Sequence, residues 1–140
     1  MKCHWSYFER WDEDKHLKIA KNYCGLKFAK IRDENAINNH SHIDQSMFSL
    51  HMHIAYLKFG FGRATSDISI AIRHKKMSRE KGFKIVKKTD HIFPSKLTDD
   101  YCNYFRMSRK KFFESLNKFI NKQIFIRKNN KLILKDSESV

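Results

Sequence analysis

The sequence predicts a mainly α-helical fold with a short β-hairpin at its C-terminal end, and three observations lead to this class. The 140 residues include only 4 Gly and 1 Pro, too few for the many turns of a β architecture. Several segments begin with a polar residue that favours a helix N-terminus and continue with apolar residues at helical spacing. Near the end, two short apolar runs flank a pair of asparagines. We therefore expect one helical region over residues 1–140, with the hairpin at residues 123–135.

The N-terminal half contains two expected helices separated by a polar loop. An aromatic stretch at residues 5–11 is expected to form a strand or a loop. The first helix begins at about Asp12, among acidic residues that suit the positive end of a helix dipole, and stops at Gly25. Residues 32–41 are polar and aperiodic, which is typical of a loop. The clearest helix covers residues 43–59. Its apolar stripe consists of Ile43, Met47, Leu50, Ile54 and Leu57.

The next segment, residues 66–73, fits either a strand or a helix. Its isoleucines alternate as in a half-buried strand, but Thr65 or Ser66 is followed by an acidic residue, as at a helix N-terminus. We favour the helix because no partner strand lies nearby in the sequence. Three further helix starts are indicated by Ser78, Pro94 and Ser108.

Charge and composition indicate a folded protein without a membrane-spanning helix or a signal peptide. Lys and Arg number 29 against 15 Asp and Glu, a net charge of +14, yet 12 Phe argue against disorder. No run of about 18 apolar residues is present, so we expect no membrane-spanning helix. Glu9, Arg10 and Asp12 interrupt the aromatic N-terminal stretch, unlike in a signal peptide. The three cysteines are widely spaced, which indicates a reducing compartment, and we expect a cytoplasmic protein.

Neither a metal site nor a catalytic residue is expected from the sequence. His40 and His42 lie in the polar loop, and His51 and His53 would diverge by about 200° on a helix, so neither pair predicts a chelating site. The sequence contains no nucleophile elbow and no glycine-rich phosphate-binding loop.

The most informative cluster joins the two expected helices in the middle of the chain. Its candidate residues are Gly60 and Gly62 as a backbone hinge, and Arg63, Thr65, Asp67 and Arg73 as substrate contacts. Arg63 can pair with phosphate or carboxylate, and Asp67 can accept a sugar hydroxyl or hold Arg63 in place. A helix that begins at Thr65 or Ser66 would also direct free N–H groups toward an anion. A purely structural ion pair between Arg63 and Asp67 fits the residues equally well.

Residues 58–65, Lys-Phe-Gly-Phe-Gly-Arg-Ala-Thr, with Asp67, Arg73 and the stretch 78–80, resemble the N-acetyl sugar amidotransferases of bacterial surface-polysaccharide biosynthesis, the WbpG/PseA type. The resemblance extends from about Trp5 to Arg127. It implies the helical C-terminal portion of an α/β enzyme similar to ATP-pyrophosphatases and adenine nucleotide alpha hydrolases.

The resemblance also implies a reaction in lipopolysaccharide biosynthesis. An ATP-dependent enzyme of this kind converts the acetamido group of a sugar or nucleotide-sugar to an acetamidino group. Partner proteins similar to a glutaminase and to a cyclase of histidine biosynthesis supply the ammonia. The family's phosphate-binding loop, of the Ser-Gly-Gly-x-Asp-Ser type, is missing from this sequence, so we expect no ATP hydrolysis by the chain alone.

Two further expectations come from charge and apolar surface. The basic excess is compatible with a small helical nucleic-acid-binding protein, whose affinity would fall steeply with salt. The basic residues are dispersed along the chain, which favours the amidotransferase interpretation. We also expect Trp5, Phe8 and Trp11 to be exposed and to promote association.

Overall fold

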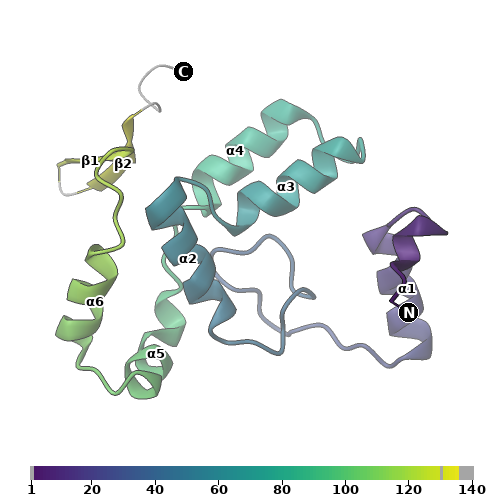
Figure 1. Ribbon diagram of the computed structural model, residues 1–140, viewed down its shortest axis with the longest axis horizontal. Helices are drawn as coiled ribbons and strands as arrows, with labels where there is room; N and C mark the ends of the chain where they lie inside the picture. Colours follow the sequence, from purple (N-terminus) through teal and green to yellow (C-terminus); the bar gives the residue numbers. More distant parts are fainter. Residues whose placement is uncertain (1, 130, 136–140) are drawn as a thin grey trace.

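The computed structural model describes residues 2–129 and 131–135. Within these residues six α-helices and one two-stranded antiparallel sheet follow one another along the chain, so the expected mainly α-helical fold with a terminal hairpin is confirmed. Figure 1 shows α2 in the middle, the α3–α4 pair on one side, and α5, α6 and the hairpin on the other. In this part of the chain no helix is both long and apolar enough to cross a membrane.

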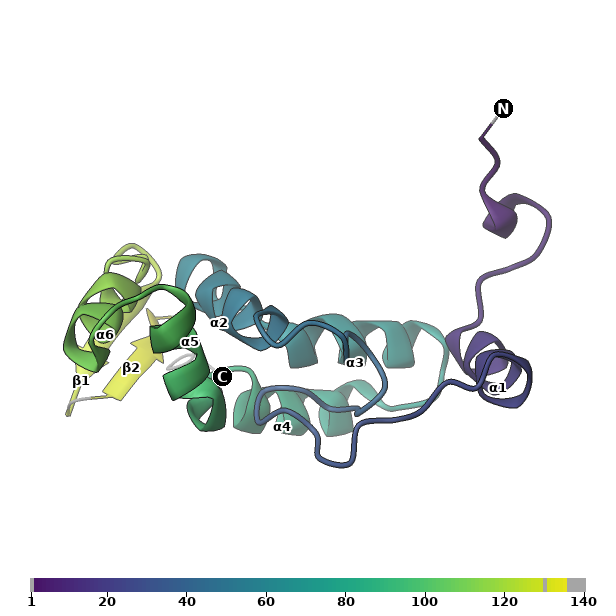
Figure 2. The ribbon, with the colours of Figure 1, turned by 90° about the horizontal axis from the view of Figure 1, so that it is seen from below.

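The N-terminal segment contains a short 3₁₀ helix, Trp5–Tyr7, and the first α-helix, α1, Glu13–Tyr23. Asp12 caps α1 by accepting hydrogen bonds from two backbone N–H groups, and Gly25 follows its end with a φ of +68°. The expected helix from Asp12 to Gly25 is therefore confirmed. Figure 2 shows the N-terminal segment extending away from the other helices. Its aromatic side chains at Trp5, Phe8 and Trp11 are all exposed, as expected.

The central helix α2, Phe48–Phe59, begins five residues later than the apolar stripe predicts. His42 adopts a left-handed φ of +53°, which ends any helical continuation upstream, and its ring stacks on Phe48. Ile43, the first residue of the predicted stripe, is exposed. The polar loop before α2 is therefore longer than expected, and its last residues fold back over the first turn of the helix.

The joint between α2 and α3 uses two glycines differently. Gly60 ends α2 in the left-handed region, with a φ of +81°, whereas Gly62 precedes α3 in extended backbone. The helix α3, Arg63–Arg73, confirms the helical interpretation of residues 66–73, but it begins before Thr65 and Ser66.

The helix α4, Arg79–Thr89, begins after Ser78, whose side chain accepts a hydrogen bond from the Lys81 N–H. It packs closely on α3, because a Cβ atom added at Gly82 would lie 2.6 Å from Ile68. After a 3₁₀ helix at Ser95–Leu97, the helix α5 covers Thr98–Tyr104. The helix α6, Arg109–Asn117, begins after its cap Ser108. The helix starts predicted at Ser78 and Ser108 are therefore confirmed, whereas the start predicted at Pro94 is that of the 3₁₀ helix and α5 begins four residues later.

The hairpin closes the described chain and completes the core. Strand β1, Phe125–Lys128, pairs with β2, Lys131–Leu134, in antiparallel register that places Phe125 opposite Leu134. One apolar cluster joins α2, α5, α6 and β1. Its buried members are Leu50, Tyr56, Leu57, Tyr101, Cys102, Phe112, Leu116 and Phe125. This cluster fixes α2 against the C-terminal elements and so positions the joint that follows it.

Candidate functional site

A cavity of about 220 Å³ lies where the polar loop covers the first turns of α2 and the start of α3. We call it the loop cavity. Its lining residues include Asn35, Asn38, Phe48, Ser49 and Arg63. It is smaller than the roughly 300–1,000 Å³ of pockets that enclose a drug-sized ligand, so it has room for one sugar-sized group.

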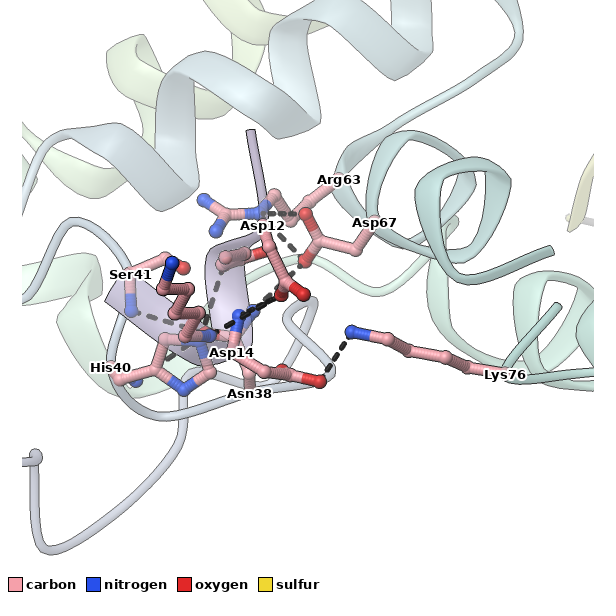
Figure 3. A network of polar contacts seen from close by, with 10 residues as sticks. Asp12, Asp14, Asn38, His40, Ser41, Arg63, Asp67 and Lys76 are labelled. Carbon is pink, nitrogen blue, oxygen red and sulfur yellow. Dashed lines mark hydrogen bonds and ion pairs between the residues drawn. The ribbon is translucent and has the colours of Figure 1, made fainter. Parts of the chain in front are cut away.

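Arg63, the first residue of α3, contributes a buried cation to this cavity. Only 7% of the residue is exposed, and its guanidinium carbon lies 4.8 Å from the centre of the Phe48 ring. Its Nε donates hydrogen bonds to both carboxylate oxygens of Asp67, at 3.1 and 3.0 Å. Within the described residues, its two terminal nitrogens make no hydrogen bond, and Figure 3 shows them on the side away from Asp67. These nitrogens can therefore bind an anion in the cavity.

Asp67 holds Arg63 from the next turn of α3. Burial raises the pKa of the Asp67 carboxyl, and the Arg63 guanidinium opposes this shift. Asp67 also accepts a hydrogen bond of 3.3 Å from the Asn38 side chain, and so links α3 to the polar loop. The structural ion pair is thus present, and it leaves part of the guanidinium for a ligand.

A polar network extends from this pair to α1 (Figure 3). The side-chain oxygen of Asn38 accepts hydrogen bonds from the backbone N–H groups of His40 and Ser41. The ring of His40 lies 3.3 Å from a carboxylate oxygen of Glu13 in α1, and Asp14 in the same helix forms an ion pair with Lys76. The network holds the polar loop over the cavity.

Asn35 provides an acceptor in the same cavity that sequence reasoning did not identify. The residue is 2% exposed, and its side-chain nitrogen donates to the backbone oxygen of Ser49 at 2.9 Å. Its side-chain oxygen is buried without a hydrogen-bond partner in the described part of the chain. Buried polar atoms are nearly always paired, so this oxygen is suited to an N–H or O–H group of a ligand.

Thr65 does not belong to the loop cavity, because it faces Asp90. The backbone N–H groups of Gly62 and Thr65 donate to the Asp90 carboxylate at 2.9 and 3.0 Å, and the Thr65 hydroxyl donates to it as well. An acidic side chain from the end of α4 therefore occupies the anion site at the N-terminus of α3. A phosphate group would be repelled there, so the residues present do not fit the phosphates of ATP.

The other predicted site residues lie apart from Arg63 and Asp67. Arg73 is exposed at the last residue of α3, about 15 Å along the helix axis from Arg63. Gly60 and Gly62, predicted as a backbone hinge, form the joint between α2 and α3, and neither lines the loop cavity. The structure thus brings together two of the four predicted contacts and adds Asn35 from the loop.

The histidine pairs take no common ligand position. His42 stacks on Phe48, whereas His40 contacts Glu13. On α2, His51 is exposed and His53 is buried. Over residues 2–129 and 131–135, no group of three or more His, Cys, Asp or Glu residues is placed to hold a metal ion.

Two comparisons with known proteins concern the chain as a whole. The chain matches the family described as LPS biosynthesis protein WbpG-like, C-terminal domain, over residues 8–137, which is almost its whole length. The match confirms the resemblance to WbpG-like proteins and, within them, to their C-terminal domain. A search among curated proteins found no match.

Proposed function

Because the chain belongs to the family of WbpG-like LPS biosynthesis proteins, as their C-terminal domain, we propose that it forms the substrate-binding part of an N-acetyl sugar amidotransferase. In this reaction the nitrogen of ammonia replaces the oxygen of a sugar acetamido group, which gives an acetamidino group. The domain holds the sugar while the chemistry takes place on the acetamido carbon.

The observation that carries the proposal is the pairing of a buried cation with a buried acceptor in one small cavity. The free nitrogens of Arg63 can bind a sugar phosphate, and the Asn35 oxygen can accept the N–H of an acetamido group. The Phe48 ring lines the same cavity and contacts both the His42 ring and the Arg63 guanidinium, so it helps to hold the cation in place for the ligand. The volume of about 220 Å³ suits one sugar-sized group rather than a complete nucleotide.

The remaining parts of the reaction belong to other groups in this proposal. The sequence contains no phosphate-binding loop, and Asp90 fills the N-terminus of α3, so no step through ATP is assigned to this chain. ATP handling and ammonia supply, the latter by glutaminase-like and cyclase-like partners, would come from outside it. Because the proposed reaction consumes ATP, we expect it to take place in the cytoplasm.

The test is a titration of the isotope-labelled chain with N-acetylglucosamine 1-phosphate, followed by nuclear magnetic resonance. We expect shifts of the Arg63 side-chain N–H signals and of the Asn35 amide. N-acetylglucosamine, which lacks the phosphate, and glucose 1-phosphate, which lacks the acetamido group, should each bind more weakly. Equal binding of all three, or shifts confined to residues outside the loop cavity, would contradict the proposal.

The same titration with duplex DNA tests the nucleic-acid alternative. Tight binding that weakens by orders of magnitude between 50 and 200 mM salt, with no response to the sugar phosphate, would replace the amidotransferase proposal.

A further inference from the structure

A second cavity, of about 940 Å³, lies between α2, α4, α6 and the hairpin. We call it the apolar groove. The side chains that make its wall apolar include Leu57, Phe83, Ile120, Ile124, Leu132 and Leu134. Its volume is near the upper end of the range of about 300–1,000 Å³ found for small-molecule sites, which is enough for an extended apolar chain.

The groove exposes an unusual amount of apolar surface. Three aromatic residues that line it are exposed, namely Phe59 at 64%, Phe83 at 53% and Phe113 at 38%. They come from α2, α4 and α6, so the apolar surface spans three helices instead of one side chain. Contiguous apolar surface of this kind marks a binding site.

Positive charge borders this apolar surface. Lys87, Arg127 and Lys131 line the groove, and all three are exposed. Among the described residues that line it, the one acidic side chain is Asp90, whose oxygens accept hydrogen bonds from Gly62 and Thr65. The rim therefore favours an anionic group.

His53 gives an independent indication of a ligand. The residue lines the groove and is only 6% exposed, and its Nδ1 atom is buried with no hydrogen-bond partner in the described part of the chain. Its ring packs edge-on against Phe93, at a centroid distance of 5.3 Å. A buried polar atom without a partner is disfavoured, and a polar group of a ligand in the groove can relieve it.

We propose that the apolar groove binds a single-chain anionic amphiphile, an alkyl chain with a phosphate head group. The chain occupies the wall between α2 and the hairpin, and the head group lies at Lys87, Arg127 and Lys131. This site is separate from the loop cavity, and its existence does not depend on the proposed function.

The test is a calorimetric titration of the full chain with octyl phosphate below its micelle concentration, with resonance shifts to locate the site. We expect saturable binding at one site, with shifts at residues of the groove such as Leu57 and Leu132. Octyl glucoside keeps the chain and lacks the charge, and inorganic phosphate keeps the charge and lacks the chain. Both should bind at least about fivefold more weakly, because each removes one of the two complementary features.

A charge-reversal variant tests the role of the rim. The double variant Lys87→Glu, Lys131→Glu should weaken octyl phosphate binding by about fivefold or more, since both side chains are exposed and their change should leave the fold intact. The double variant Lys110→Glu, Lys111→Glu, at two exposed positions of α6 outside the groove, changes the net charge by the same amount; it is the matched control and should bind as the natural chain does.

Several results would overturn the proposal. Equal affinity for octyl glucoside would exclude a role for the cationic rim, and equal affinity for inorganic phosphate would exclude a role for the groove wall. Equal weakening by the double variant Lys110→Glu, Lys111→Glu would show an unspecific effect of net charge. Binding to anionic vesicles without binding of the monomeric amphiphile would replace the ligand with a membrane surface. A dimer in sedimentation whose interface covers the groove would replace it with a second copy of the chain.

Discussion

The two cavities lie along the same helix and have opposite character. The N-terminal half of α2 lines the loop cavity through Phe48, Ser49 and Met52, and the C-terminal half lines the apolar groove. The helix is apolar on most of its circumference, as expected for a helix covered on several sides. The segments that pack over each half of α2 therefore determine whether its cavity is polar or apolar.

An irregular loop covers the first cavity and regular elements border the second. The loop brings amide side chains: Asn38 accepts hydrogen bonds from the loop backbone, whereas Asn35 donates to the Ser49 carbonyl of α2 and leaves its own buried oxygen unpaired. The hairpin and α4 bring leucine, isoleucine and phenylalanine to the groove. The comparison shows how one helix can border a polar and an apolar cavity without any change in its own sequence pattern.

The largest expected effect is the loss of Asp90, because this residue belongs to both regions. It caps the helix that begins with Arg63, and it also lines the apolar groove. Asp90→Ala removes a buried acceptor of three hydrogen bonds, so the free energy of unfolding should fall by about 2–3 kcal/mol. Urea denaturation measures this change.

Asp99→Ala is the control for that variant. Asp99 pairs with Arg109 at 2.6 Å, but both side chains are exposed, so its loss should change the free energy of unfolding by about 0.5 kcal/mol or less. Equal losses in the two variants would show that Asp90 has no special role in joining the regions.

The second effect concerns the stability of the fold at acidic pH, and it arises from His53, which lines the apolar groove and not the loop cavity. Burial lowers the pKa of His53 to about 4, with the nearby Ile92 backbone opposing the shift. The unfolded chain, with a pKa near 6.5, binds this proton first as the pH falls, so the folded state loses stability between about pH 6.5 and 4. From pH 7 to pH 5 this group should lower the free energy of unfolding by about 2 kcal/mol.

His53→Phe removes the titrating group and should flatten that part of the pH dependence. His51→Gln, at an exposed position of the same helix, should keep the slope of the natural chain. Urea denaturation at pH 7 and pH 5 provides the comparison. An unchanged slope in His53→Phe would mean that another group is responsible.

The sequence predicted the local parts of this molecule and missed the long-range ones. The caps at Asp12, Ser78 and Ser108 act on backbone groups two or three residues away, so a short window of sequence contains both partners. Asp90 acts on Gly62, 28 positions away, and nothing near either residue indicates the contact.

The candidate site follows the same division. Arg63 and Asp67 are one helical turn apart, and their pairing was foreseeable from spacing alone. Asn35 lies in a polar stretch that predicted only a loop, and its burial depends on α2 packing over it. The start of α2 was predicted five residues too early, because the turn at His42 has no strong local signal in the sequence.

A third effect separates the two cavities by ligand. Arg63→Lys keeps the positive charge but loses the planar guanidinium. In Arg63 the Nε atom of this group holds Asp67, and the two terminal nitrogens face the cavity. Binding of N-acetylglucosamine 1-phosphate should therefore weaken by about tenfold. Binding of octyl phosphate should not change. Arg73→Lys is the matched control on the same helix, and a comparable loss there would contradict the assignment of Arg63.

The smallest expected effect on sugar-phosphate binding separates the role of the Asn35 acceptor from that of the Arg63 cation. Asn35→Ala should weaken binding of N-acetylglucosamine 1-phosphate by about threefold, because one neutral hydrogen bond is lost. Glucose 1-phosphate, which offers no acetamido N–H, should bind the variant and the natural chain alike. An equal loss for both sugars would assign Asn35 a purely structural role.

The most direct measurement is a crystal structure of the chain with N-acetylglucosamine 1-phosphate. We expect the phosphate within hydrogen-bond distance of the terminal nitrogens of Arg63, and the acetamido N–H directed at the Asn35 oxygen, with the Asp67 contact retained. A sugar bound elsewhere, or terminal nitrogens of Arg63 engaged by protein groups with the cavity closed, would contradict the substrate-binding role of this domain.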